Sequence, residues 1–303
     1  MMTFLDCARL IEQELLGSDL CFGQGVDNAF DEAVWLIISA AEINDEPIDW
    51  QLILTAEQKL AVRELTDRRV KSRIPLAYLL KRAWFAGYEF YIDQRAIIPR
   101  SYIGEWISDR FEPWLAKARV RSVLDLCTGS GCIAVATALA FPEATIDATD
   151  ISLDALDVAK INTTKYGVAE RVQLFQGDLF NALPNNTQYD MILCNPPYVS
   201  DEAMASFPPE YDFEPTSAFS AGSDGLFFIR RILNEARQHL GAEGSIFIEV
   251  GTAAEAVEKN WSKVPFTWLT SLAGESPVLF LTAQLLDSYQ ENFVSPSIKN
   301  KPS

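Results

Sequence analysis

From Ser122 onward, short runs rich in β-branched and apolar residues alternate with runs of helical spacing. The expected strands cover residues 122–126, 145–149, 172–176, 191–194, 245–250, 266–271 and 278–283. The expected helices cover residues 131–140, 153–166, 225–240 and 252–260. Because parallel strands need long crossover connections, this order predicts an α/β fold with a mostly parallel, Rossmann-like sheet covered by helices on both faces. No helix is expected between the last two strands, which should therefore form an antiparallel hairpin at the end of the sheet.

The first 83 residues have a different, helical pattern. Apolar side chains recur at helical spacing at Phe4, Ala8, Ile11 and Leu15. A second helix is expected from Phe30 behind an Asp27 cap. A third begins at Thr55, which can form a capping box with Gln58, and runs to about Ser72.

Residues 84–98 change to a period of two around Gly87 and a second turn at Asp93-Gln94, which is typical of a β-hairpin. Pro99-Arg100 then interrupts the pattern. We expect a helical domain over residues 1–83, a β-hairpin linker over 84–99, a larger α/β domain over 100–287 and a frayed polar tail over 288–303.

Composition excludes several kinds of protein. The formal net charge is −17, whereas a protein that grips nucleic acid needs a basic surface. Five cysteines without a paired spacing and a single histidine argue against a disulfide framework, a zinc site or a histidine-dependent hydrolase. No apolar run approaches the roughly 20 residues of a membrane span, and the first residues lack a secretion pattern. We therefore expect a globular, cytoplasmic protein with no metal and no membrane partner.

The strand expected at residues 122–126 runs into a glycine-containing turn. The candidate ligand-binding residues of this stretch are Asp125, Cys127, Thr128, Gly129, Ser130 and Gly131. Glycines let the backbone approach a ligand closely, and the following helix presents free N–H groups at its N-terminus. Dinucleotide-binding enzymes use the same device, but here the third glycine of their fingerprint is absent.

Two more acidic residues follow at the ends of the next expected strands. Asp150, followed by Ile151, can accept hydrogen bonds from both hydroxyls of a ribose. Asp178, followed by Leu179, can accept from the exocyclic amine of an adenine. Each aspartate alone is more often a cap or turn residue. With Asp125 they make three acids at the carboxyl edge of one sheet, which favours a nucleoside cofactor.

The fourth strand is followed by Asn195, Pro196, Pro197 and Tyr198. Prolines have no N–H and stiffen the loop, so that carbonyl oxygens are presented without competing donors. Asn195 adds a side-chain acceptor and borders the cofactor site, and Tyr198 adds an aromatic face for a planar amide or a sulfonium cation. A Pro-Pro turn that merely closes the strand is the structural alternative. Next to a cofactor site, such an array of acceptors suits a substrate with an NH₂ group.

These motifs together resemble class I S-adenosylmethionine-dependent methyltransferases that act on planar NH₂ groups. The helical leader followed by residues 84–100 resembles the HemK/PrmB-like N(5)-glutamine methyltransferases, over most of residues 1–285. The resemblance implies S-adenosylmethionine as the cofactor, residues 1–83 as a substrate-recognition domain and 100–287 as the catalytic domain. It also implies that Asn195, Pro196 and Tyr198 act on the substrate amide.

Two branches of that family differ in their motifs. The release-factor enzymes carry Arg-Pro-x-Thr-Glu after the hairpin and a glycine in the turn, where this chain has Pro99-Arg-Ser-Tyr-Ile103 and Cys127. Both features resemble the branch that methylates ribosomal protein three of the large subunit. Six acids and no base between Asp201 and Asp224 would form an exposed negative lip that attracts such a basic protein.

Other functions remain open from the sequence. Release factors are the alternative protein substrate. An adenine methyltransferase on nucleic acid shares the Asn-Pro-Pro-Tyr motif, but the net charge argues against it. Residues 58–82 carry eight bases and two acids, which indicates either a solvated helix face or contact with an acidic or RNA-bearing partner. A non-enzymatic ribosome-assembly scaffold is the remaining alternative.

Overall fold

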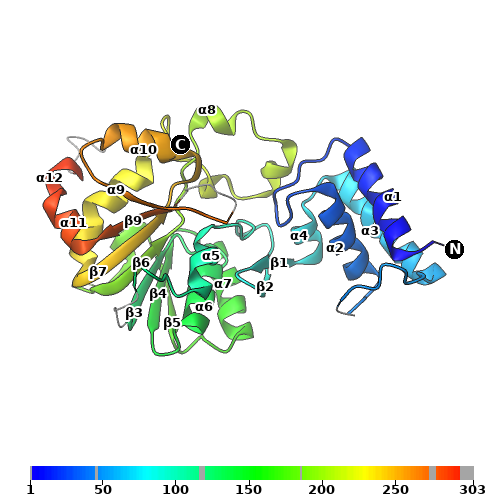
Figure 1. The fold of residues 1–303 in the computed structure, drawn as a ribbon, viewed down its shortest axis with the longest axis horizontal. Helices are drawn as coiled ribbons and strands as arrows, with labels where there is room; N and C mark the ends of the chain where they lie inside the picture. The colour runs from blue at the N-terminus through cyan, green and yellow to red at the C-terminus, as the bar shows by residue number, and fades with distance from the viewer. Residues whose placement is uncertain (1, 45–46, 116–119, 185, 273–277, 294–303) are drawn as a thin grey trace.

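The computed structural model describes residues 2–44, 47–115, 120–184, 186–272 and 278–293. The molecule is elongated, with a group of helices from the N-terminal part at one end and a large sheet with its covering helices at the other (Figure 1). Among the helices described, none is long and apolar enough to span a membrane.

The N-terminal part is helical, and its first three helices begin at side-chain caps. The helices are α1 (Phe4–Gly17), α2 (Ala29–Ala40), α3 (Ala56–Ser72) and α4 (Leu76–Leu80). The capping box of Thr55 and Gln58 is confirmed at the start of α3. The cap predicted for the second helix is wrong by one residue. Asn28, not Asp27, accepts the hydrogen bond from the Asp31 amide.

A short hairpin follows, formed by β1 (Arg82–Phe85) and β2 (Tyr88–Tyr91). The turn at Gly87 is confirmed, with φ of +80° at that glycine. The strand pattern does not continue beyond Tyr91. Instead, Ile92 and Ile98 bury their side chains from an irregular stretch that leads to α5 (Ile103–Ser108).

The large sheet has seven strands in the order β5-β4-β3-β6-β7-β9-β8. They are β3 (Ser122–Leu126), β4 (Thr145–Asp150), β5 (Val172–Gln176), β6 (Tyr189–Cys194), β7 (Leu240–Glu249), β8 (Thr267–Leu269) and β9 (Val278–Thr282). The five strands from β5 to β7 in this order are parallel to one another. Strand β9 is antiparallel to both of its neighbours, β7 and β8. The predicted α/β class, the mostly parallel sheet and the antiparallel pair at its end are therefore confirmed.

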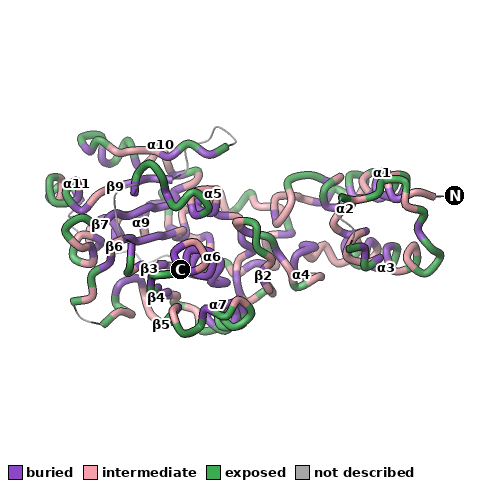
Figure 2. The backbone as a smooth tube through the Cα atoms, turned by 60° about the horizontal axis from the view of Figure 1, so that its bottom comes forward, coloured by how far each residue is buried: buried purple, intermediate pink, exposed green. Residues whose placement is uncertain are grey.

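Helices cover both faces of this sheet. They are α6 (Cys132–Ala140), α7 (Leu153–Lys165), α9 (Phe227–Glu235), α10 (Ala254–Asn260) and α11 (Ala283–Ser288). Val123 packs with α5 and α6, whereas its neighbour Leu124 packs with α9 and α11, because successive side chains of a strand point to opposite faces. Figure 2 shows that the central strands are mostly buried.

Short helical turns join these elements. They are η1 (Leu179–Ala182), α8 (Asp201–Met204), η2 (Pro209–Phe213), η3 (Thr216–Ala218), η4 (Ala236–His239) and η5 (Gly251–Ala253). The prediction that the tail frays from Ser288 is wrong for residues 290–293. Residues Gln290–Phe293 form helix α12, and Phe293 is buried against Trp261. The remainder of that tail lies outside the described residues.

Candidate active site

A cavity of about 570 Å³ opens at the carboxyl ends of β3, β4, β5 and β6. The predicted site residues that line it are Cys127, Thr128, Gly129, Ser130, Asp150, Ile151, Asp178, Leu179, Asn195, Pro196, Pro197 and Tyr198. Two predicted residues, Asp125 and Gly131, do not line it. Ligands of α/β proteins bind at this edge, outside the carboxyl ends of the strands.

The turn after β3 follows a left-handed backbone path. Cys127, Gly129 and Gly131 have φ of +59°, +55° and +76°. A Cβ on Gly129 would lie 3.6 Å from Ile97 Cγ2, an ordinary van der Waals contact, so the positive φ rather than crowding favours glycine here. A Cβ on Gly131 would lie 2.9 Å from that of Ala159, so this glycine lets α7 pack closely. Cys127 occupies a conformation that favours glycine, the residue that the release-factor pattern has there.

Asp125 lies beneath the turn and is fully buried. Its Oδ2 accepts a hydrogen bond of 2.6 Å from the Thr128 hydroxyl and one of 3.1 Å from the Ala134 amide. The carboxyl group therefore holds the turn against the first turn of α6, where an acid also suits the helix dipole. Its contribution is to the shape of the ligand-binding turn.

Asp150 and Asp178 lie at the edge of the cavity, and the carboxylate of each already has a partner within the chain. Asp150 accepts from the Gly129 amide and the Ser152 amide, both at 2.9 Å, which fixes its carboxylate over the turn. Each of its oxygens keeps a lone pair for a further donor. Asp178 Oδ1 forms an ion pair of 2.8 Å with Arg231 on α9, a partner that the sequence pattern did not indicate.

The Asn-Pro-Pro-Tyr segment begins directly after β6 and enters the same cavity. Among the described residues, no hydrogen-bond partner is found for the side chain of Asn195 or the carbonyl of Pro196. The Tyr198 hydroxyl donates to Glu249 Oε1 at 3.2 Å. The Tyr198 ring lies against Gly251, where a Cβ would come within 2.4 Å of it. Both contacts fix the plane of the ring, while the acceptors of Asn195 and Pro196 stay available.

Glu249 is a site residue that the sequence analysis missed. It lies at the end of β7, lines the cavity and is 1% exposed. Its Oε2 accepts from the Ser101 hydroxyl at 2.6 Å and from the Tyr102 amide at 2.8 Å. The signal that could have indicated it is the one used for Asp150, an acid at the carboxyl end of an expected parallel strand.

The free energy of unfolding should depend on pH through Asp125 and Glu249. Burial raises the pKa of each carboxyl to about 7, from ordinary values of 3.8 and 4.5. Between roughly pH 4.5 and 7 the folded state then binds more protons than the unfolded state, so the free energy of unfolding falls as pH rises. The limit is roughly 1.4 kcal/mol per pH unit and group. We expect Glu249→Gln to lose less stability than the wild type between about pH 5 and pH 8 in chemical denaturation.

The control for this experiment is Glu258→Gln, because Glu258 is exposed on α10. Its stability should follow the wild-type pH dependence. An identical pH dependence in the wild type and Glu249→Gln would contradict the raised pKa of Glu249.

The acid-only segment between Asp201 and Asp224 is not a fully exposed lip. Glu210 and Glu214 are buried and form ion pairs with Arg73 and Arg100. The prediction of an exposed negative lip is therefore wrong for Glu210 and Glu214. Exposed positions remain at Asp201, Glu202, Asp212 and Asp224, and the last of these pairs with Arg230.

The same segment contributes aromatic rings to the cavity, which the charge pattern did not indicate. Phe207, Tyr211 and Phe219 contact one another, with ring centroids 4.4 to 5.7 Å apart, and all three line the cavity. We call these three residues the aromatic wall. Arg100 places its guanidinium 5.7 Å from the Tyr211 ring and 5.6 Å from the Phe219 ring.

The basic run at residues 58–82 is largely neutralised within the chain. Its bases that pair with acids are Arg63, Arg69, Lys71, Arg73 and Arg82. Arg69 is 1% exposed and pairs with the buried Glu32, so the solvated-face interpretation is wrong for that residue. Internal pairing accounts for much of the local positive charge.

Comparisons with known proteins match nearly all of the chain to one family. The methyltransferase small domain model matches residues 110–207. The ribosomal protein uL3 glutamine methyltransferase of Burkholderia pseudomallei is 41% identical over 293 residues, which cover 94% of this chain and 95% of that protein. The enzymes with the same name in Bordetella pertussis and Neisseria gonorrhoeae are 40% identical, over 95% and 94% of this chain and 97% and 96% of theirs.

These findings confirm the resemblance drawn from the motifs, including the choice of the ribosomal over the release-factor branch. Sequence identity of 40 to 41% over nearly the full length of both proteins indicates a common family. The chain belongs to the family of ribosomal protein uL3 glutamine methyltransferases.

Proposed function

We propose that this protein methylates the side-chain amide nitrogen of a glutamine in ribosomal protein uL3, with S-adenosylmethionine as the methyl donor. The observation that carries the proposal is that the Asn-Pro-Pro-Tyr segment and the turn after β3 line one cavity. The choice of uL3 is supported by the names of relatives that align over nearly the whole chain.

The cavity fits the cofactor in size and in chemistry. Its volume of about 570 Å³ lies in the range of small-ligand sites. Asp150 would accept from the ribose hydroxyls, and Asp178 from the adenine amine, with Ile151 and Leu179 beside them. Gly129 lines the cavity without a side chain, so a ligand could approach the backbone of this turn closely. When bound, S-adenosylmethionine supplies an electrophilic methyl group on a sulfonium.

The protein's task is to position a weak nucleophile. The lone pair of an amide nitrogen is delocalised into its carbonyl group. Asn195 Oδ1 and the Pro196 carbonyl oxygen would accept hydrogen bonds from the two N–H groups of the substrate amide, which localises electron density on nitrogen and aims it. The Tyr198 ring, held in place by Glu249 and Gly251, would pack against the plane of the amide.

The proposed methyl transfer does not need a strong base from the Asn-Pro-Pro-Tyr segment. A nitrogen–carbon bond forms as the carbon–sulfur bond breaks, and the bonding pair of the latter stays on sulfur. The nitrogen then loses one proton to water. The residues of this chain therefore contribute orientation and electrostatic stabilisation.

We further propose residues 1–83 as the substrate-recognition domain, 84–99 as its linker and 100–287 as the catalytic domain. The exposed acids at Asp201, Glu202 and Asp212 stand in the segment that supplies the aromatic wall. A negative surface there would attract a basic ribosomal protein and repel nucleic acid.

Labelled S-adenosylmethionine and three acceptors test this function: purified uL3, purified release factors and DNA. We expect label on one glutamine of uL3, located by mass spectrometry of peptides, and none on DNA. The Asn195→Ala variant serves as the inactive control. Preferential labelling of a release factor or of DNA would reject uL3 as the substrate.

A further inference from the structure

The segment from Val199 to Gly222, which we call the acceptor loop, carries the aromatic wall. Its two ends are tied together at the cavity. The Val199 amide donates to the Phe219 carbonyl, and the Ala221 amide donates to the Val199 carbonyl, both at 2.9 Å. Between these ends the loop extends away from the sheet, so its middle needs support from elsewhere in the chain (Figure 1).

That support comes from two buried glutamates. Glu214 accepts hydrogen bonds from both terminal nitrogens of Arg100, at 3.0 and 2.9 Å, and from the Ile98 amide at 3.0 Å. Its fourth donor is Gln24 Nε2, at 2.7 Å, from the segment between α1 and α2. A buried carboxylate is tolerated only when it is paired and hydrogen-bonded, so these donors determine where the loop can lie.

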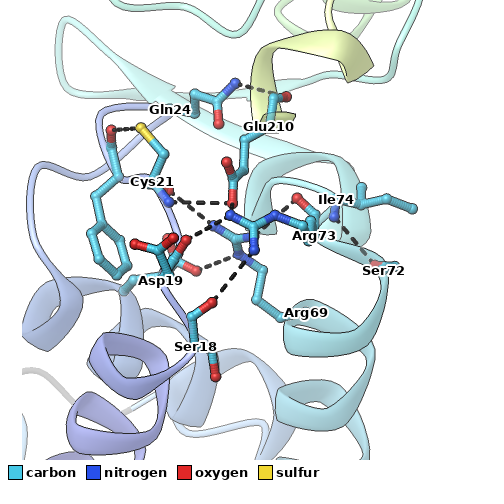
Figure 3. A network of polar contacts seen from close by, with 11 residues as sticks. Ser18, Asp19, Cys21, Gln24, Arg69, Ser72, Arg73, Ile74 and Glu210 are labelled. Atoms are coloured by element: carbon cyan, nitrogen blue, oxygen red, sulfur yellow. Dashed lines mark hydrogen bonds and ion pairs between the residues drawn. The ribbon is translucent and has the colours of Figure 1, made fainter. Parts of the chain in front are cut away.

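Glu210 makes the second attachment to the N-terminal helical part (Figure 3). It pairs with Arg73 at 2.7 Å and accepts from the Cys21 amide at 3.2 Å. The Glu210 carbonyl accepts from Gln24 Nε2 at 3.2 Å, so one side-chain nitrogen of Gln24 serves both glutamates. Gln24 Oε1 is buried without a partner among the described residues, which leaves donation as the role of this amide.

The contacts continue from Gln24 to the cavity. Glu214 orients the guanidinium of Arg100, which lies over the rings of Tyr211 and Phe219. A shift of Glu214 would therefore move both the loop and the arginine that contacts its aromatic residues. None of these contacts involves Asp150 or the turn after β3. The network acts on the acceptor side of the cavity.

We propose that Gln24 is a positioning residue for methyl transfer. By donating to Glu214 and Glu210 it holds the acceptor loop so that the aromatic wall is formed before the substrate glutamine enters. The helical part then has a role in shaping the acceptor site, separate from contact with the rest of the protein substrate. The inference rests on the proposed methylation of uL3.

The test compares Gln24→Leu with the matched control Gln13→Leu, because Gln13 is exposed on α1. Leucine removes the donor while keeping a similar size. We expect the KM for uL3 to rise at least about tenfold in Gln24→Leu, because the hydrogen bonds from Gln24 Nε2 to Glu214 and to Glu210 are both lost. The Kd for S-adenosylmethionine should stay within about twofold of the wild type. Amide hydrogen exchange should become faster in residues 199–222 and remain unchanged in β3 and β4.

A second variant, Gln24→Asn, is the milder change to use if leucine prevents folding. Its amide is one methylene shorter, so its donor is drawn back from Glu214 and Glu210, and KM and exchange should change in the same direction as in Gln24→Leu but by less. An unchanged KM with unchanged exchange in both variants overturns the proposal. Equal losses of cofactor binding and acceptor binding overturn it as well, since they indicate a general structural role. If wild-type enzyme does not methylate uL3, the proposed function fails, while the exchange data still decide whether Gln24 holds the loop.

Discussion

Replacing Asn195 by alanine is expected to lower kcat for methylation of uL3 by about 10² to 10³-fold, while the Kd for S-adenosylmethionine stays within about twofold. The reason is geometric and electrostatic. In the structure the side chain of Asn195 has no partner among the described residues, so its oxygen is free to accept from the substrate amide. Alanine removes that acceptor and leaves the turn after β3 unchanged.

Single-turnover transfer of labelled methyl and a calorimetric titration of the cofactor measure the two quantities for Asn195→Ala separately. The matched control is Asn181→Ala, because Asn181 is exposed in η1. The control should keep both the rate and the cofactor affinity. Comparable losses of rate and of cofactor affinity in Asn195→Ala would sink the assignment of Asn195 to the substrate amide.

Replacing Asp150 by alanine is expected to raise the Kd for S-adenosylmethionine by about 10²-fold. The charged carboxylate would no longer accept two hydrogen bonds from the ribose hydroxyls. The Gly129 amide would also lose the acceptor that it reaches at 2.9 Å, so the turn itself would loosen. Because the defect lies in binding, saturating cofactor should restore much of the rate.

Titration of Asp150→Ala, Asp150→Asn and the exposed control Asp154→Ala by calorimetry separates the contributions. Asparagine keeps one acceptor and loses the charge, so its Kd should fall between those of the wild type and Asp150→Ala. An unchanged Kd in Asp150→Ala would reject the ribose assignment.

The α/β sheet could be predicted because its signals are local. Strands such as 122–126 are short apolar runs bounded by turn residues, and both signals lie within a few residues of each other. The turn after β3 and the Asn-Pro-Pro-Tyr segment were found for the same reason. Parallel strands bring their carboxyl ends to one edge, so topology alone placed these local motifs in one cavity.

The charge pattern predicted the structure less well than the local motifs did, because it does not show which charged side chains pair in the folded chain. Glu214 and Arg100 are 114 positions apart, and nothing near either residue indicates a buried pair. Arg69 stands in a basic run that is typical of a solvated face, yet its partner Glu32 comes from another helix. Buried ion pairs need partners from distant segments, which periodicity and local composition cannot detect.

The two neighbours Arg100 and Ser101 contact different buried carboxylates, Glu214 in the acceptor loop and Glu249 at the end of β7. A helical part inherited from another branch would function here only if it brought a donor to the position of Gln24, since Glu214 is shared between that donor and Arg100. In this chain, changes in the helical part and changes in the acceptor loop are therefore coupled through the contact between Gln24 and Glu214.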